Sequence, residues 1–82
     1  MKITVRYFAS LREAIGQSQE ELQTHASHAG QVRDELLARG GAYACLSRDR
    51  AVRLALNQVM VQEDAQLLEN AALAFFPPVT GG

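Results

Sequence analysis

The sequence has little of several features that mark common classes of protein. It contains one cysteine, Cys45, no tryptophan, and a formal net charge of only −1. A single cysteine cannot form an internal disulfide, so the sequence predicts a cytoplasmic protein rather than a disulfide-stabilised secreted one. The near-neutral charge argues against a general nucleic-acid binder, which would have an excess of basic residues. No run of about 18 apolar residues is present, so we expect no membrane-spanning helix.

Apolar residues are nevertheless plentiful enough for one small core. Of the 82 residues, 48% are hydrophobic. A chain of this length forms one domain and buries about 60% of its unfolded surface, so its stability is modest. The sequence shows no linker, internal repeat or low-complexity segment. We therefore expect a single domain over residues 1–82, in which 77–82 form a flexible, extended tail.

Alternation of apolar and polar residues predicts the strands. Residues 2–8, KITVRYF, place Ile3, Val5 and Tyr7 on one face and the other four residues on the opposite face. Further strands are predicted at 19–24, 52–56, 58–62 and 72–76. Asn57-Gln58 is the turn between the third and fourth strands. The first and last strands are the most apolar and are expected in the centre of the sheet, whereas the charged second strand is expected at an edge.

Two helices complete the predicted fold. Ser10 followed by Glu13 fits a capping box, which predicts a short helix over 10–15. An apolar stripe predicts a longer helix over 32–39. Residues 42–50 fit either a helical turn or a loop. The order β-α-β-α-β-β-β indicates an α+β fold, with a mixed sheet of four or five strands and the longer helix across one face.

The last nine residues, AFFPPVTGG, differ from an ordinary polar terminus. Pro77 and Pro78 lack amide hydrogens, so the last strand cannot continue past Phe76 and the chain leaves the domain extended. Residues 77–82 reach at most about 20 Å, which is long enough to enter a pocket on another protein. Only glycine fits a channel that has no room for a Cβ atom. Gly81 is therefore interpreted as a residue that passes through such a channel.

The α-carboxylate of Gly82 is then the reactive group that the tail delivers. A carboxylate can attack the α-phosphate of ATP to give an acyl-adenylate, and a sulfur nucleophile can displace AMP from it. No phosphate-binding loop is present in the sequence, so ATP would be bound by another protein and this chain would hold no cofactor. The alternative interpretation is that the two glycines form a disordered end without chemistry.

The strand pattern also predicts a docking surface for a partner. Leu73 and Phe75 form the core face of the last strand, which leaves Phe76 on the outer face just before the tail. Phe8 and Arg6 lie on the outer face of the first strand. If these strands are neighbours, the phenylalanines form an exposed aromatic patch with an arginine at its rim. The alternative is that the short helix or the C-terminal loop covers one or both rings. The tail residues expected to contact the partner are Pro77, Pro78, Val79 and Thr80.

Charged residues after the longer helix permit two interpretations. Arg48, Arg50 and Arg53 are close in sequence, which fits either a basic surface for an acidic partner or a solvated face. The residues predicted to be simple surface charges are Asp49, Glu63 and Asp64.

Histidine and cysteine do not predict a metal site or a nucleophile. His25 and His28 lack the further ligands that a metal needs, so we expect no bound metal and two solvent-exposed loop histidines. Cys45 lies in the apolar stretch AYACLS and is expected to be a buried small hydrophobe.

Two stretches, KITVRYFASLREAIG near the start and FFPPVTGG at the end, resemble the small subunit of molybdopterin synthase. That family is a group of ubiquitin-like β-grasp sulfur carriers. The resemblance covers residues 1–23 and 52–82, including ALNQ at 55–58, and the middle of the chain matches only in pattern.

Two local departures from the family pattern affect only expected stability. Members usually begin the main helix with a Thr or Ser cap, whereas this chain has Gln31 there, with Gly30 or Ser27 as substitute caps. The turn before the last strand often carries Gly-Asp. Here it is Glu69-Asn70, in which Asn70 tolerates a positive φ.

The resemblance implies a sulfur-transfer cycle. Gly82 would be adenylated by an enzyme related to the ubiquitin-activating class, and a cysteine desulfurase or rhodanese-type donor would supply sulfur for a thiocarboxylate. The tail would enter the large synthase subunit and donate sulfur to cyclic pyranopterin monophosphate, which builds the dithiolene of molybdopterin for molybdenum cofactor biosynthesis. The assembly would be a heterotetramer of two small and two large subunits. The large subunit would supply the catalytic side chains, so this chain would be a sulfur-donating subunit.

Three other functions fit the sequence and rank below this one. Thiamine thiazole synthesis or tRNA thiolation would keep the carrier chemistry, although thiamine-type carriers are usually shorter and lack FFPPVTGG. A protein modifier would be joined through Gly82 to a target lysine. A non-reactive binding domain would be unaffected by deletion of Gly81-Gly82.

Overall fold

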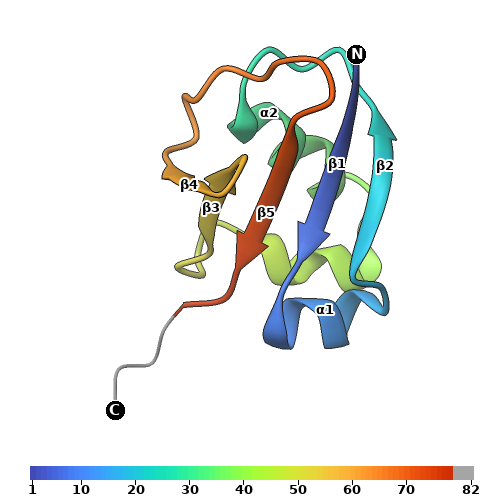
Figure 1. The fold of residues 1–82 in the computed structure, drawn as a ribbon. Helices are drawn as coiled ribbons and strands as arrows, with labels where there is room; N and C mark the ends of the chain where they lie inside the picture. Colours follow the sequence, from blue (N-terminus) through green and yellow to red (C-terminus); the bar gives the residue numbers. More distant parts are fainter. Residues whose placement is uncertain (79–82) are drawn as a thin grey trace.

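The computed structural model describes residues 1–78, whose strands join one mixed sheet in the order β2-β1-β5-β3-β4 (Figure 1). The elements in chain order are β1 (Lys2–Tyr7), α1 (Ala9–Ile15), β2 (Gln19–Gln23), α2 (Ala29–Leu37), the 3₁₀ helix η1 (Gly41–Leu46), β3 (Arg53–Leu56), β4 (Val59–Val61) and β5 (Ala72–Phe76). β1 and β5 are parallel, and the other pairs are antiparallel. The predicted α+β class and order of strands and helices are confirmed, with β1 and β5 inside the sheet and β2 at an edge.

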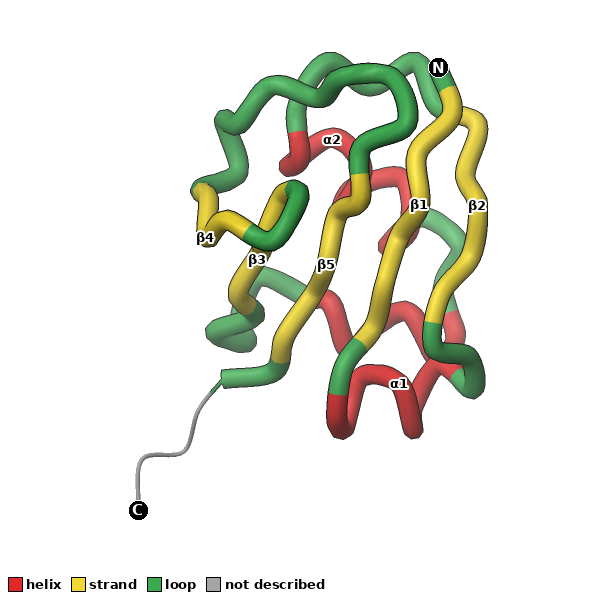
Figure 2. Tube along the Cα trace, in the orientation of Figure 1, coloured by secondary structure: helices red, strands yellow, loops and turns green. Residues whose placement is uncertain are grey.

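The sheet buries one face against α2, which lies behind it in Figures 1 and 2. From β1, the alternate residues Ile3, Val5 and Tyr7 are at most 1% exposed, and from β5 both Leu73 and Phe75 are 0% exposed. The residues that oppose them include Ala29, Val32 and Leu36 of α2 and Leu46 of η1. The predicted core face of both strands is therefore confirmed, and we call the opposite side of the sheet the outer face.

The short helix α1 begins one residue earlier than predicted and is not capped by a side chain. Phe8 is its N-cap residue, and the Phe8 carbonyl accepts hydrogen bonds from the amides of Leu11 (3.1 Å) and Arg12 (3.4 Å). Ser10 therefore lies inside the first turn, and the predicted capping box is wrong. Gly16 ends the helix with φ 89°, a left-handed conformation that glycine adopts readily.

The longer helix α2 begins three residues before the predicted start. Its first amides are satisfied from a distant segment, because Ala29 donates to the Ala65 carbonyl (2.9 Å) and Gly30 donates to the Glu63 carbonyl (2.8 Å). His28 is the N-cap residue, so neither predicted substitute cap is used. A Cβ atom on Gly30 would lie 2.9–3.0 Å from side-chain atoms of Glu63, which shows how closely the two segments approach.

The segment left open by the sequence forms η1 and a following turn, and Arg33 fixes it to α2. The Arg33 side chain is buried, and its guanidinium donates to the carbonyls of Leu46 (2.6 Å) and Ser47 (2.9 Å). Burial of an arginine is costly unless its donors are satisfied, so these bonds stabilise the connection between α2 and β3.

The hairpin between β3 and β4 turns as predicted. Asn57 and Gln58 both have positive φ, 50° and 71°, which matches a type I′ turn. Asn57 also ties this turn to β5, because its amide donates to the Ala72 carbonyl (2.8 Å) and its side-chain oxygen accepts from the Ala72 amide (2.9 Å). Asn70, before β5, has φ 66°, in agreement with its predicted tolerance of this conformation.

Candidate docking face

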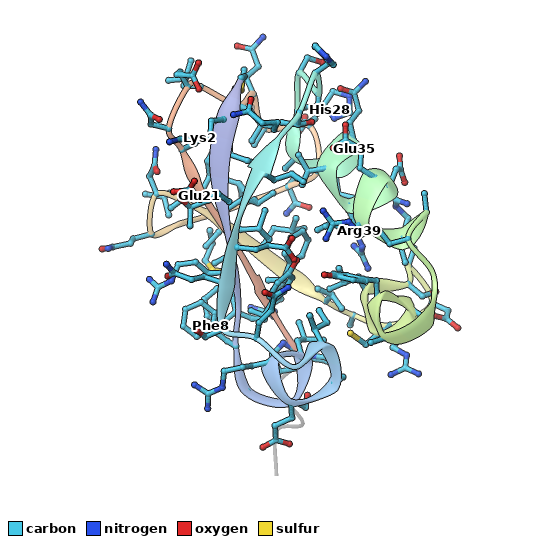
Figure 3. All side chains as sticks on the ribbon, turned by 90° about the vertical axis from the view of Figure 1, so that its right-hand side faces the viewer. Lys2, Phe8, Glu21, His28, Glu35 and Arg39 are labelled. Carbon is cyan, nitrogen blue, oxygen red and sulfur yellow. The ribbon has the colours of Figure 1, made fainter. Side chains whose placement is uncertain are left out.

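Phe8 and Phe76 meet on the outer face of the sheet. Their rings stack with centroids 4.5 Å apart and an angle of 11° between the planes. Figure 3 shows Phe8 on the side of the sheet away from α2. Both side chains are partly exposed, so neither α1 nor the chain after β5 covers them completely. The predicted proximity of the two rings is confirmed.

Backbone pairing brings these two rings together. The Phe8 amide donates to the Phe75 carbonyl (3.2 Å), which extends the parallel pairing of β1 and β5 one residue past the end of β1. The next residue, Ala9, has φ 51° and directs the chain into α1. The Arg6 guanidinium carbon lies 5.1 Å from the centroid of the Phe8 ring, within range of a cation–π interaction. The predicted position of Arg6 at the rim of the aromatic patch is therefore confirmed.

The outer face beside the aromatic pair is hollowed to a volume of about 370 Å³. Three alanines form part of its lining. Ala55 of β3 pairs with Ala74 of β5, and Ala72 lies on the same face of β5, two residues before Ala74. The other lining residues are Arg6, Phe8, Asn57, Gln58, Met60 and Phe76. Small residues between larger side chains leave room for apolar side chains of a partner. We call the residues that line this hollow the docking face.

Sequence reasoning missed Met60 as part of this face. Met60 pairs with Ala55 across the hairpin, and the residue is 55% exposed. Counting the hairpin register outward from the Asn57-Gln58 turn would have placed Met60 on the same face as Ala55. The missing step was the register of β3 against β5, which no local pattern specifies.

The tail starts at the edge of the docking face. β5 ends at Phe76, as the two prolines predict, and Pro77 and Pro78 follow. The prolines help to line a second hollow, of about 610 Å³, together with residues of α1 and of the segment before β3. The predicted site residues Val79, Thr80, Gly81 and Gly82 lie outside the described residues.

The structure separates the arginines of the predicted basic cluster. Arg48 is bound to Asp34 and Glu63, each at an N–O distance of 2.5 Å. The Arg48 hydrogen bond is the main reason that the pKa of Glu63 is lowered, although burial opposes it. Arg50 lines the second hollow, and Arg53 lies opposite Phe76 on the sheet. The interpretation that Arg48, Arg50 and Arg53 form one basic surface is therefore wrong. The prediction that Glu63 is a simple surface charge is also wrong.

The positions of the two histidines and of Cys45 do not indicate a catalytic or metal-binding role. His25 is exposed as predicted, whereas His28 is half-buried at the start of α2, which contradicts the expected exposed loop position. Cys45 is half-buried against the core, and burial raises the pKa of its thiol although Arg50 opposes the shift. A raised pKa keeps the thiol protonated and poorly nucleophilic. Among residues 1–78, no three or more His, Cys, Asp or Glu residues are grouped so that they could hold a metal ion.

The sheet order and the helix across one face define a ubiquitin-like β-grasp domain, as predicted. A subunit described as a putative molybdopterin converting factor, subunit 1, from Pyrococcus furiosus has a similar structure, with a TM-score of 0.78 and 25% identity over 96% of this chain and 99% of that one. A complex of subunits 1 and 2 of molybdopterin-converting factor from Helicobacter pylori contains the same fold, with a TM-score of 0.71 and 19% identity over the full length of both chains. No helix within residues 1–78 is both long and apolar enough to cross a membrane.

Sequence comparison then identifies the family. The model of the ThiS family matches residues 5–82. The molybdopterin synthase sulfur carrier subunit of Escherichia coli strain K12 is 34% identical over 80 residues, which cover 98% of this chain and 99% of that protein. The chain therefore belongs to the ThiS family, and its resemblance to the sulfur-carrier subunits of molybdopterin synthase is confirmed.

Proposed function

We propose that this protein is the sulfur-carrying subunit of a molybdopterin synthase and that Gly82 carries the sulfur. The observation that supports this most strongly is the stacked pair Phe8 and Phe76 beside the alanine-lined hollow, at the point where the PPVTGG tail begins. An exposed aromatic pair next to a hollow has the composition of a protein-binding site. Similarity to sulfur carrier subunits over nearly the whole length of both chains supports the same function.

The proposed reaction starts with activation of the Gly82 carboxylate. A carboxylate oxygen attacks the α-phosphate of ATP, pyrophosphate leaves, and the glycine becomes an acyl-adenylate. An adenylyltransferase of the ubiquitin-activating class binds the ATP. A persulfide on a cysteine desulfurase or rhodanese-type donor then displaces AMP, and a second thiol reduces the resulting acyl disulfide to the thiocarboxylate. Gly81 contributes by letting the chain pass through a channel too narrow for a Cβ atom.

The proposed second half of the cycle takes place on the large subunit. The docking face binds that subunit while the tail, through Pro77, Pro78, Val79 and Thr80, extends into its active site. The thiocarboxylate donates sulfur to cyclic pyranopterin monophosphate, and two such transfers build the dithiolene. The large subunit supplies the catalytic side chains, in a heterotetramer of two small and two large subunits. This chain supplies sulfur and binding energy.

Intact-mass spectrometry tests the carrier step. The full chain is incubated with ATP, a reducing thiol, and the activating enzyme and sulfur donor of the same organism, and we expect a mass gain equal to the replacement of one oxygen by one sulfur. Fragmentation is expected to place the change at Gly82, and deletion of Gly82 is expected to abolish it. Omission of ATP is the matched chemical control.

Other outcomes of that experiment separate the competing functions. An unmodified chain, under conditions in which a known carrier reacts, contradicts the proposal and favours a non-reactive binding domain. When the incubation is repeated in a cell extract, a chain joined to lysines of other proteins through Gly82 identifies a protein modifier. When the large subunit and the pterin precursor are then added, a thiocarboxylate that is not consumed points to another sulfur-accepting pathway.

A further inference from the structure

Arg6 and Arg53 lie on either side of Phe76 on the outer face of the sheet. Arg6 of β1 is in register with Ala74 of β5, and Arg53 of β3 is in register with Phe76. With strands about 4.8 Å apart and a rise of about 3.3 Å per residue, the two arginine Cα atoms are roughly 12 Å apart. Both residues are exposed. Arg6, which lines the docking face, and Arg53, which lies beside it, therefore flank the tail end of this face from opposite sides.

No carboxylate within residues 1–78 forms an ion pair with either of these arginines. Lys2 and Glu21, also on the outer face in Figure 3, lie 3.9 Å apart and offset each other. Arg48, by contrast, is bound to two carboxylates away from this face. The region around Phe76 is thus locally positive, although the whole chain has a formal net charge of −1.

Binding of a protein over Phe76 removes water from both guanidinium groups. A buried cation without a counter-charge is strongly unfavourable, whereas an arginine paired with a carboxylate forms two charge-assisted hydrogen bonds. An electroneutral apolar partner surface would therefore fit the aromatic pair but not the two cations. An acidic surface with apolar residues at its centre satisfies both.

We propose that the large-subunit partner presents carboxylates opposite Arg6 and Arg53, around apolar side chains that occupy the alanine-lined hollow. This inference rests on the proposed function and adds the chemistry of the surface that the chain recognises. The apolar contact supplies most of the affinity, and the charge pairs orient the chain so that the tail approaches its channel. Charge complementarity of this kind acts mainly on the association rate and on partner choice.

Association kinetics with the purified large subunit of molybdopterin synthase from the same organism test the proposal. The full chain is compared with the double variant Arg6→Glu/Arg53→Glu over a series of salt concentrations. We expect the double variant to associate at least about tenfold more slowly at low salt, with a difference that shrinks as screening increases. Arg12→Glu, an exposed residue of α1, is the control with the same change of charge at one site. Arg6→Lys/Arg53→Lys is expected to associate within about threefold of the wild type, because it keeps both charges.

The outcomes distinguish failure of this inference from failure of the proposed function. A double charge reversal that associates as fast as Arg12→Glu, or faster than the wild type, overturns the acidic partner surface and leaves the proposed function intact. A wild-type chain that does not bind the large subunit at all overturns the proposed function and this inference with it. Thermal unfolding of every variant checks that a slower association does not come from loss of the fold.

Discussion

Phe75 and Phe76 are adjacent in the same strand, yet their surroundings differ completely. Phe75 is 0% exposed and stacks on Tyr7 with ring centroids 6.2 Å apart, inside the core. Phe76 is partly exposed on the outer face, where its ring stacks on Phe8. The alternation of side chains along a strand assigns one ring to stability and leaves the other to binding. Substitutions of the two rings are therefore expected to affect different properties, the free energy of unfolding for Phe75 and the affinity for a partner for Phe76.

Substitution of Phe75 by alanine is expected to have the largest effect. Loss of a fully buried phenylalanine costs about 3–5 kcal/mol in the free energy of unfolding, because its contacts and its apolar burial are removed together. That is a large part of the stability of a domain of this size. Urea unfolding followed by circular dichroism measures the loss. A cost below about 1 kcal/mol would contradict the core position of Phe75.

Phe76→Ala is expected to separate binding from stability. We predict a loss of about 2 kcal/mol in binding to the large subunit, roughly a 30-fold weaker Kd, because an aromatic anchor is removed. The free energy of unfolding is expected to fall by only about 1 kcal/mol, from the lost stacking on Phe8. Isothermal titration calorimetry and urea unfolding give the two values.

Leu68→Ala is the matched control for that experiment. Leu68 is 69% exposed in the loop before β5, outside the docking face, so its truncation removes apolar surface without touching the proposed interface. Unchanged affinity for Leu68→Ala together with weaker binding of Phe76→Ala supports the docking face. Equal affinities for both variants and the wild type would remove Phe76 from the interface.

A smaller effect is expected from substitution of Glu20, which links the core face of the sheet to the segment that follows α2. Its carboxylate accepts hydrogen bonds from Tyr7 (2.8 Å), Tyr43 (2.9 Å) and Arg39 (2.8 Å). Burial alone would raise the pKa of Glu20, but these hydrogen bonds outweigh it and lower the pKa. Because the folded-state pKa is the lower one, this contribution is complete above the unfolded-state pKa near 4.5 and is lost as pH falls through the folded-state value.

Glu20→Gln is therefore expected to cost about 1 kcal/mol in the free energy of unfolding at neutral pH. The difference from the wild type is expected to decrease in acid below about pH 4.5, where the unfolded carboxylate of the wild type becomes protonated. Urea unfolding at several pH values measures this, with Glu13→Gln at an exposed position of α1 as the control. A difference that does not change with pH would show that the charge of Glu20 contributes nothing.

Local pattern alone predicted much of this molecule. The period-two alternation placed Leu73 and Phe75 in the core and Phe76 outside, and the two prolines placed the end of β5. These features depend only on neighbouring residues. The proximity of Phe8 and Phe76 required one further assumption, that the first and last strands are adjacent, and the parallel pairing of β1 and β5 satisfies it.

The remaining features depend on contacts between distant segments. The start of α2 is set by the carbonyls of Glu63 and Ala65, more than thirty positions along the chain, so no capping pattern near Ala29 reveals it. The arginines near residue 50 have separate roles because β3 begins among them and carries Arg53 to the outer face. Met60 was missed for the same reason, since its face follows from its pairing with Ala55 and from the register of Ala55 against β5.

The most direct test of sulfur donation from Gly82 is to follow the intact mass of the thiocarboxylated chain after it is mixed with the large subunit and cyclic pyranopterin monophosphate. We expect the chain to return to its unmodified mass, with two chains consumed for each pterin converted to the dithiolene. A thiocarboxylate mass that persists, while the large subunit remains bound and accepts sulfur from a known carrier, would contradict the proposal that this chain supplies the sulfur of molybdopterin.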